Sequence, residues 1–266
     1  MTPVLFVCRA VCAAVLVTTA SACVLAAEPA SAPATTPGKT YAIVSLIGDE
    51  FTVVRRRPLV GTQMDPNEKT RAPISDPVFD RAAAAAAEQA ILSASPGMPV
   101  LKVGIRDPRL FALQDKLLAE SGDSHDMRVA LHDLLAKAGA TDLLLVTKRR
   151  ADALFPVVDG TVSGGGQIGG LGFFIDDVTR MYDTTHLQTG EGFLAPYAYI
   201  MVSLMDIGTM KLVRSKAVQQ SSMALTVEAV NAVRAWDALT AAEKVKALDG
   251  VISTAVTSGT KSAIAP

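Results

Sequence analysis

Two short polar segments of the sequence contain the residue types that ester hydrolysis requires. Ser124 could act as a nucleophile, and Asp183 and His186, three positions apart, could supply a carboxylate and a base. A serine hydroxyl attacks a carbonyl when a histidine accepts its proton, and that histidine works best when a carboxylate orients it. A periplasmic serine hydrolase that uses Ser124, Asp183 and His186 is therefore one hypothesis for this chain.

The surroundings of Ser124 favour a structural role over a catalytic one. Gly122-Asp123-Ser124 is similar to the motif of GDS-type esterases, in which the serine follows a buried strand near the start of the domain. Here it follows residues 117–121, which are typical of a helix end, and no G-x-N-D element for an oxyanion hole lies between Ser124 and His186. We therefore expect Ser124 to cap the helix that begins at His125.

Acidic and histidine side chains also gather between Glu120 and Asp133, in a density that could indicate a metal site. A helix over 125–138 has Met127 and Leu131 on its apolar face, so His132 and Asp133 fall on the opposite face, in solvent. An exposed charged face explains this composition without a metal. We predict no metal site here.

The spacing Gly164-x-Gly166-x-x-Gly169 formally matches the dinucleotide-binding fingerprint. That motif works between a strand and a helix, where the glycines let a phosphate approach the helix N-terminus. In this chain the next five residues, 170–174, are Gly-Leu-Gly-Phe-Phe, which is a poor helix start, and the segment contains no G-K-[ST]. We expect no cofactor.

The same segment is rich in glycine, with seven glycines between Gly160 and Gly172, and this predicts a loop over 160–174. Two interpretations stay open: a mobile surface loop, or a contact loop whose apolar side chains press on a partner or a membrane. The candidate contact residues are Ile168, Leu171, Phe173 and Phe174. A small-ligand pocket near residues 182–197 is a third and less defined alternative.

Strands and helices alternate in the first half of the chain. Apolar runs predict strands covered on both faces over 41–47 and 142–147. Weaker patterns predict two further strands over 51–57 and 99–105. Helix starts and apolar periodicity predict helices from Asp76-Pro77, from Asp107-Pro108 and from His125. The polar stretch 58–77, with four prolines, is expected to be a long surface excursion.

Antiparallel strands dominate the second half. Residues 193–206 and 211–220 have strand composition and flank a glycine-containing turn, which predicts a hairpin. A helix over 227–239 is followed by Thr240 and Glu243, a capping box that opens the last helix. This order predicts an α/β fold with a mixed β-sheet flanked by helices, an α/β sandwich, with an antiparallel hairpin in the second half.

The bulk composition excludes some classes of function. Of 266 residues, 50% are hydrophobic and 19% are charged, which is a folding composition rather than a disordered one. The formal net charge is -1, so the chain lacks the basic excess that nucleic-acid binding requires.

The N-terminus has the order of features that marks a secretory signal. Arg9 is followed by the short apolar run Ala10–Val17 and then by small residues, so we predict a signal peptide over 1–27. The run is too short to span a bilayer, and no later segment is long and apolar enough, so we expect no transmembrane helix after processing. Residues 28–39, rich in Pro, Ala and Thr, are expected to form a flexible tether before a single domain over 40–266.

All three cysteines, Cys8, Cys12 and Cys23, lie in the signal region, so we expect no disulfide in the processed protein. Ala20-Ser21-Ala22-Cys23 resembles a bacterial lipobox, although Ala20 stands where leucine is usual. Lipidation at Cys23 and ordinary cleavage near Ala27 both stay open. The expected location is accordingly the periplasm, free or associated with the outer membrane.

Two segments of the domain resemble bacterial envelope modules. Residues 134–146 match a helix that ends in small residues and is followed by a strand beginning Ala-Asp and continuing with apolar residues. Residues 202–213 match a hairpin of the type V-x-L-x-D-x-x-T-G-x. This layout resembles the curli-secretion lipoprotein, the lipoprotein activators of penicillin-binding proteins and the N-terminal domain of the Tol-system propeller protein. The hairpin glycine precedes Thr209 instead of following it. The resemblance implies a non-enzymatic role in scaffolding, regulation or assembly.

The sequence therefore favours an exported envelope protein that binds, assembles or regulates another envelope component. The expected partner is another envelope protein or the membrane surface, contacted through a sheet edge or the 160–174 segment. The sequence indicates no particular oligomeric state. The serine hydrolase remains the alternative.

Overall fold

The computed structural model describes residues 38–57, 65–118, 125–157, 160–183, 188–226, 236–237 and 239–265. Several sequence-based predictions lie outside these ranges: the signal peptide over 1–27, most of the tether over 28–39, Cys23, Ser124, His186 and most of the helix predicted over 227–239. No helix within the described ranges is long and apolar enough to cross a membrane.

Three parallel strands form one half of the sheet. β1 (Tyr41–Leu46) lies between β4 (Val100–Val103) and β5 (Asp142–Lys148) and is parallel to both. All six residues of β1 are buried, which is the result expected for an apolar run covered on both faces. The predicted strands over 41–47, 99–105 and 142–147 are confirmed.

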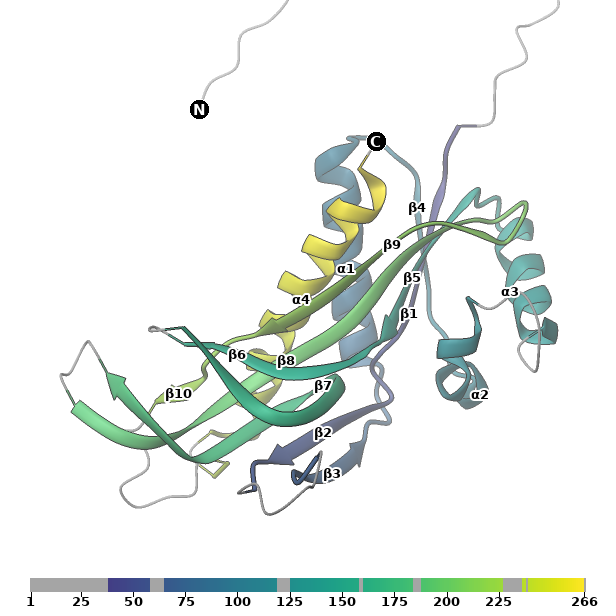
Figure 1. The fold of residues 1–266 in the computed structure, drawn as a ribbon. Helices are drawn as coiled ribbons and strands as arrows, with labels where there is room; N and C mark the ends of the chain where they lie inside the picture. The colour runs from purple at the N-terminus through teal and green to yellow at the C-terminus, as the bar shows by residue number, and fades with distance from the viewer. Residues whose placement is uncertain are drawn as a thin grey trace, which may run out of the picture. The chain divides into compact units, whose positions relative to one another are not determined.

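Helices that connect these strands cover opposite faces of the sheet (Figure 1). α1 (Val78–Ala94) connects to β4 and packs on one face with α4 (Ala241–Ile264). α2 (Pro108–Ala112), the short 3-10 helix η1 (Gln114–Lys116) and α3 (His125–Lys137) lead from β4 to β5 on the other face. The apolar periodicity that predicted this helix corresponds to a buried stripe of six residues: Phe79, Ala83, Ala86, Ala87, Ala90 and Ile91.

Asp76 marks the expected start of α1 but does not cap the helix with its side chain. The Asp76 carboxylate forms no cap hydrogen bond and instead lies 2.8 Å from Arg81 Nη1, while the Asp76 carbonyl accepts from the Val78 N–H. Asp80, in the first turn, ties the helix to the end of β1. Its Oδ1 accepts hydrogen bonds from Ser45 Oγ at 2.7 Å, Ile47 N at 3.0 Å and Gly48 N at 3.1 Å.

The burial of Asp80 gives a pH prediction. Burial raises the pKa of the Asp80 carboxyl above its ordinary value, although the three hydrogen bonds oppose this. Folding therefore favours the protonated form, and this contribution is present at low pH and lost as the pH rises through the folded-state pKa. Asp80→Asn keeps an acceptor oxygen without the charge, so we expect it to match or exceed the wild type in unfolding free energy at neutral pH.

Denaturant unfolding across an acid-to-neutral pH series measures this effect. The difference between Asp80→Asn and the wild type should shrink as the pH falls and Asp80 becomes protonated; a difference that grows in acid would contradict the assignment. Asp80→Ala leaves two backbone N–H groups without their acceptor and should cost about 2 kcal/mol in acid, where Asp80 is protonated. This cost should shrink as the pH rises, because only the wild type then carries a buried charge.

A hairpin of β2 (Glu50–Arg55) and β3 (Glu68–Pro73) extends the sheet beyond the parallel strands. β2 was expected from the sequence. β3 falls within the stretch 58–77, which was predicted to be a surface excursion; its residues are exposed as expected, but the strand itself was missed. β3 pairs with β2 alone at the edge of the sheet, and five of its six residues are exposed. An edge strand with exposed faces carries no apolar alternation that would reveal it.

The prediction of a loop over 160–174 is also wrong. These residues begin β7 (Gly160–Asp183), which pairs antiparallel with β6 (Arg150–Val157) as far as Gly169 and with β8 (Gln188–Asp206) from Gly170 onwards. The four predicted contact residues are between 0% and 3% exposed: Ile168, Leu171, Phe173 and Phe174. They fill the protein's own core, so the predicted partner contact through their side chains does not hold.

The glycines of β7 serve close packing rather than mobility. A Cβ on Gly172 would lie 2.0 Å from the Thr52 carbonyl oxygen and 2.5 Å from the Tyr197 hydroxyl. Any side chain at this position would collide with the two neighbouring strands, so only glycine lets β2, β7 and β8 approach.

The hairpin predicted in the second half is confirmed. β8 (Gln188–Asp206) pairs antiparallel with β9 (Lys211–Ser221), and Asp206 Oδ1 accepts from the Thr209 N–H at 2.8 Å in the turn between them. β10 (Leu225–Thr226) pairs with β8, and α4 (Ala241–Ile264) begins with the expected Thr240–Glu243 capping box.

These elements confirm the predicted fold class, a mixed sheet flanked by helices. Within the described ranges ten strands form one sheet, whose main order is β3-β2-β7-β8-β5-β1-β4. One core lies between the sheet and helices α1 and α4, and a second lies between the sheet and α3. A third lies where the β6–β7 hairpin curves over β8, rich in aromatic residues such as Phe155 and Phe174 (Figure 1).

Two glycines of α4 test how the helix packs on the sheet. Gly250 is exposed and a Cβ there would meet nothing within 4 Å, so Gly250→Ala should stabilise the protein by about 1 kcal/mol. A Cβ on Gly259 would lie 2.5 Å from Val202 Cγ2 on β8, so Gly259→Ala should destabilise it by about 1–3 kcal/mol. Thermal unfolding of both variants measures the contrast, and shifts of the same sign would refute it.

Candidate functional site

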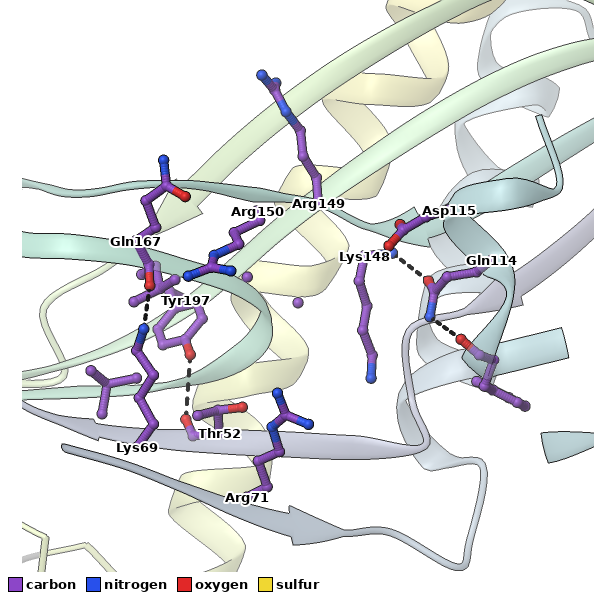
Figure 2. A pocket seen from close by; sticks show the side chains of 15 residues that line it. Thr52, Lys69, Arg71, Gln114, Asp115, Lys148, Arg149, Arg150, Gln167 and Tyr197 are labelled. Atoms are coloured by element: carbon purple, nitrogen blue, oxygen red, sulfur yellow. Dashed lines mark hydrogen bonds between the residues drawn. The ribbon is translucent and has the colours of Figure 1, made fainter. Parts of the chain in front are cut away.

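A cavity of about 340 Å³ opens where β5 leaves the parallel strands and continues into β6 (Figure 2). Its walls come from β2, β3, η1, the β5–β6 junction and the point at which β7 changes partners. Five of its lining residues are cations: Lys69, Arg71, Lys148, Arg149 and Arg150. Only one lining residue, Asp115, is acidic. We call this cavity the basic pocket.

Local structure places these cations together. Lys69 and Arg71 are two positions apart on β3, so their side chains leave the same face of the strand. Lys148, Arg149 and Arg150 cross the β5–β6 junction, where the Gln114 side-chain oxygen accepts from Lys148 N at 2.7 Å. Figure 2 shows Arg71, Lys148 and Arg150 directed into the cavity, whereas Arg149 extends away from it.

Internal carboxylates neutralise some of this charge. Lys148 Nζ lies 2.5 Å from Asp49 Oδ1 and 3.4 Å from Glu50 Oε1. Lys69 Nζ forms an ion pair with Asp65 and donates to the Gln167 carbonyl oxygen at 2.7 Å.

The arginines of the pocket are less well compensated. Arg150 Nη2 is 3.9 Å from Asp65 Oδ2, and Arg71 and Arg149 form no ion pair with any residue in the described ranges. A cavity concentrates the field of the charges that line it. The pocket therefore has positive charge to offer an incoming group.

The floor of the pocket is neutral. The Tyr197 hydroxyl is buried beneath it and donates to the Thr52 carbonyl oxygen at 3.4 Å (Figure 2). Burial raises the pKa of Tyr197 well above its ordinary value, so the phenol keeps its proton at neutral pH. Val54, Phe111 and Ile168 add apolar surface to the wall. The pocket thus combines positive charge, hydrogen-bond donors and some apolar contact.

The residues of the hydrolase hypothesis are not brought together by the described structure. Ser124 and His186 lie outside the described ranges, and Asp183 is the last residue of β7, where only the backbone is described. The hypothesis therefore remains a prediction. On α3, His132 Nδ1 lies 3.0 Å from the exposed Asp133, and the described ranges contain no group of three side chains that could hold a metal ion.

The basic pocket was not predicted from the sequence, although one signal was present. Lys148-Arg149-Arg150 directly follows the apolar strand predicted over 142–147. The carboxyl ends of parallel strands are where open α/β sheets place their ligand sites. The other contributions, from Lys69 and Arg71, come from an edge strand that the sequence did not reveal.

Comparisons with known proteins identify no family. No family model matches the sequence, and no curated protein sequence matches it at a significant level. Solved structures with some similarity include protein XCC0632 from Xanthomonas campestris, at 9% identity and a TM-score of 0.35, covering 83% of this chain and 80% of that one.

Two further structures have similar scores. The PelC dodecamer from Paraburkholderia phytofirmans has 10% identity and a TM-score of 0.31, covering 89% of this chain and 93% of that one. Lipoprotein GNA1162 from Neisseria meningitidis has 10% identity and a TM-score of 0.28, covering 70% of this chain and 84% of that one. Scores this low assign neither a family nor a function.

Proposed function

We propose that this protein is an exported, non-enzymatic binding module of the bacterial envelope, which captures an anionic group of another envelope component in the basic pocket. The observation that carries the proposal is the convergence of Lys69, Arg71, Lys148 and Arg150 on one cavity from two separate parts of the chain. Export rests on the charge, the short apolar run and the small residues of the first 27 positions.

The type of cation favours an oxyanion as the ligand. Arg71 and Arg150 present planar guanidinium groups, which bind carboxylate and phosphate oxygens through paired hydrogen bonds. The cavity of about 340 Å³ lies at the small end of the range for ligand sites, which runs from about 300 to 1,000 Å³. It fits a small anion or the anionic end of a larger molecule.

The lining favours binding over turnover. The described residues that line the pocket include no serine, cysteine or histidine, and the one tyrosine is buried and neutral. Positive charge and hydrogen-bond donors can hold an oxyanion, whereas nucleophilic catalysis needs a nucleophile beside a base.

Anion-dependent stabilisation tests the proposal. A ligand that binds only the folded state stabilises it by about 2.7 kcal/mol at a concentration of 100 times its Kd. Citrate and inorganic phosphate should therefore raise the melting temperature of the wild type more than that of the Arg71→Ala, Arg150→Ala variant, whereas exclusion of these anions from the surface stabilises both proteins alike. Equal shifts in the two proteins would count against a specific site.

The hydrolase alternative is tested separately with an acyl ester substrate. We expect no turnover above background, and Ser124→Ala and His186→Ala should have no effect on any residual rate. Turnover that both substitutions abolish would replace the binding proposal with the hydrolase.

A further inference from the structure

One end of the basic pocket already holds an anion supplied by the protein itself. Asp65 precedes β3 and forms an ion pair with Lys69, and its Oδ2 lies 3.9 Å from Arg150 Nη2. The backbone N–H of Gln167 also donates to Asp65 Oδ2 at 3.5 Å. This carboxylate therefore touches two pocket cations and one main-chain donor.

The structure makes room for this carboxylate. Gly166 has a φ of +76°, and a Cβ on it would lie 2.3 Å from Asp65 Oδ1. The preceding Gly165 also has a positive φ, and Asn67 donates to the carbonyl oxygens of Gly164 and Gly165. The segment before β3 is thus held against the glycine-rich part of β7, with Asp65 at the point of contact.

The donors around Asp65 are those that recognise phosphate. An ammonium, a guanidinium and a main-chain N–H beside glycines of positive φ form a typical cradle for a tetrahedral oxyanion. All three donors share one oxygen of the Asp65 carboxylate, Oδ2, which lies 3.5 Å from the Gln167 N–H and 3.9 Å from Arg150 Nη2. A phosphate group has several oxygens and can offer a separate one to each donor.

We propose that the end of the basic pocket formed by Lys69, Arg150 and the Gln167 N–H is a phosphate subsite, which Asp65 fills until a phosphate ester replaces it. This inference rests on the proposed anion-binding function and names its ligand class. Asp65 sets the affinity of the subsite, because an incoming phosphate must first displace it or share its donors.

The substitution Asp65→Asn tests whether phosphate replaces the Asp65 carboxylate, since asparagine keeps the size of the side chain and removes the competing charge. Removing a unit negative charge beside the ligand should tighten binding of inorganic phosphate by about fivefold or more. The gain should disappear in the Asp65→Asn, Lys69→Ala double variant, because the subsite itself is then lost. Calorimetric titration measures all three affinities.

Asp115→Asn is the matched control. It removes the one acidic side chain of the pocket lining, which comes from η1 and has no contact with Lys69 or Arg150 in the described structure. An equal gain in both variants would show a general field effect and overturn the exchange at Asp65. If Asp65→Asn melts at a lower temperature than the wild type, Asp65→Ser provides a second, smaller replacement. It should show the same gain in phosphate affinity, and the proposal fails if it does not.

Two sources of phosphate are separated by two arms of the experiment. A gain with inorganic phosphate alone indicates a soluble phosphate ester, whereas greater co-sedimentation with vesicles containing an anionic phospholipid, over zwitterionic vesicles, indicates a lipid headgroup. A response in neither arm overturns the inference. If Asp65→Asn changes nothing while loss of Arg71 still weakens anion binding, only the inference fails; if no variant binds any anion, the proposed function fails with it.

Discussion

Replacing Asp176 with alanine is expected to destabilise the protein by about 3–5 kcal/mol, because it leaves a partly buried arginine without its counter-charge. The Asp176 side chain is 0% exposed and its Oδ2 lies 2.6 Å from Arg56 Nη1. It also accepts hydrogen bonds from the N–H and the hydroxyl of Thr179, at 2.8 and 2.7 Å. These bonds fix the irregular stretch of β7 that begins at Asp176.

The neighbouring residue supplies a matched control. Asp177 pairs with Arg55 at 2.6 Å, but its side chain is 48% exposed, so Asp177→Ala should cost no more than about 1 kcal/mol. Urea unfolding of the two variants compares a buried with an exposed ion pair on adjacent residues. Similar losses for both would mean that burial does not govern the strength of the Asp176 interaction.

Removing the two arginines that face the cavity should abolish most anion binding. Arg71→Ala and Arg150→Ala each delete a charge-assisted contact worth about 1.5–3 kcal/mol, so each should weaken binding by about tenfold or more. Arg71 is exposed and the Arg150 side chain is 68% exposed, so the fold should tolerate both changes.

A second pair of arginines separates local contact from net charge. Arg81 and Arg109 lie on α1 and α2, outside the basic pocket, with side chains 61% and 77% exposed. The Arg81→Ala, Arg109→Ala variant has the same net charge as the pocket double variant and should keep wild-type affinity. Equal losses in the two double variants would locate anion binding in the overall charge and not in the pocket.

Local patterns were sufficient to predict the parallel strands, the main helices and the last hairpin. The apolar run at 41–47, the six-residue stripe that begins at Phe79 and the capping box at Thr240 each depend on residues close in sequence. Such patterns report burial and end signals directly.

The strands β3, β6 and β7 depended on contacts between distant residues and were missed. Glycine at 172 is required by Thr52 and Tyr197, yet in the sequence a run of glycines is typical of a loop. The same distance hid the pocket, because Arg71 and Arg150 are brought together only by pairing of β2 with β3 and β7. Non-local pairing of this kind has no signature in a short window of sequence.

The most direct test of anion capture is a residue-resolved titration of the folded protein with inorganic phosphate by NMR. The backbone amides of Gln167, Gly169 and Gly170, which lie in the wall of the basic pocket, should shift together and saturate. In the Arg71→Ala, Arg150→Ala variant these shifts should vanish while the rest of the spectrum is unchanged. Shifts that are absent, that spread over unrelated surfaces or that persist in the double variant would contradict the account.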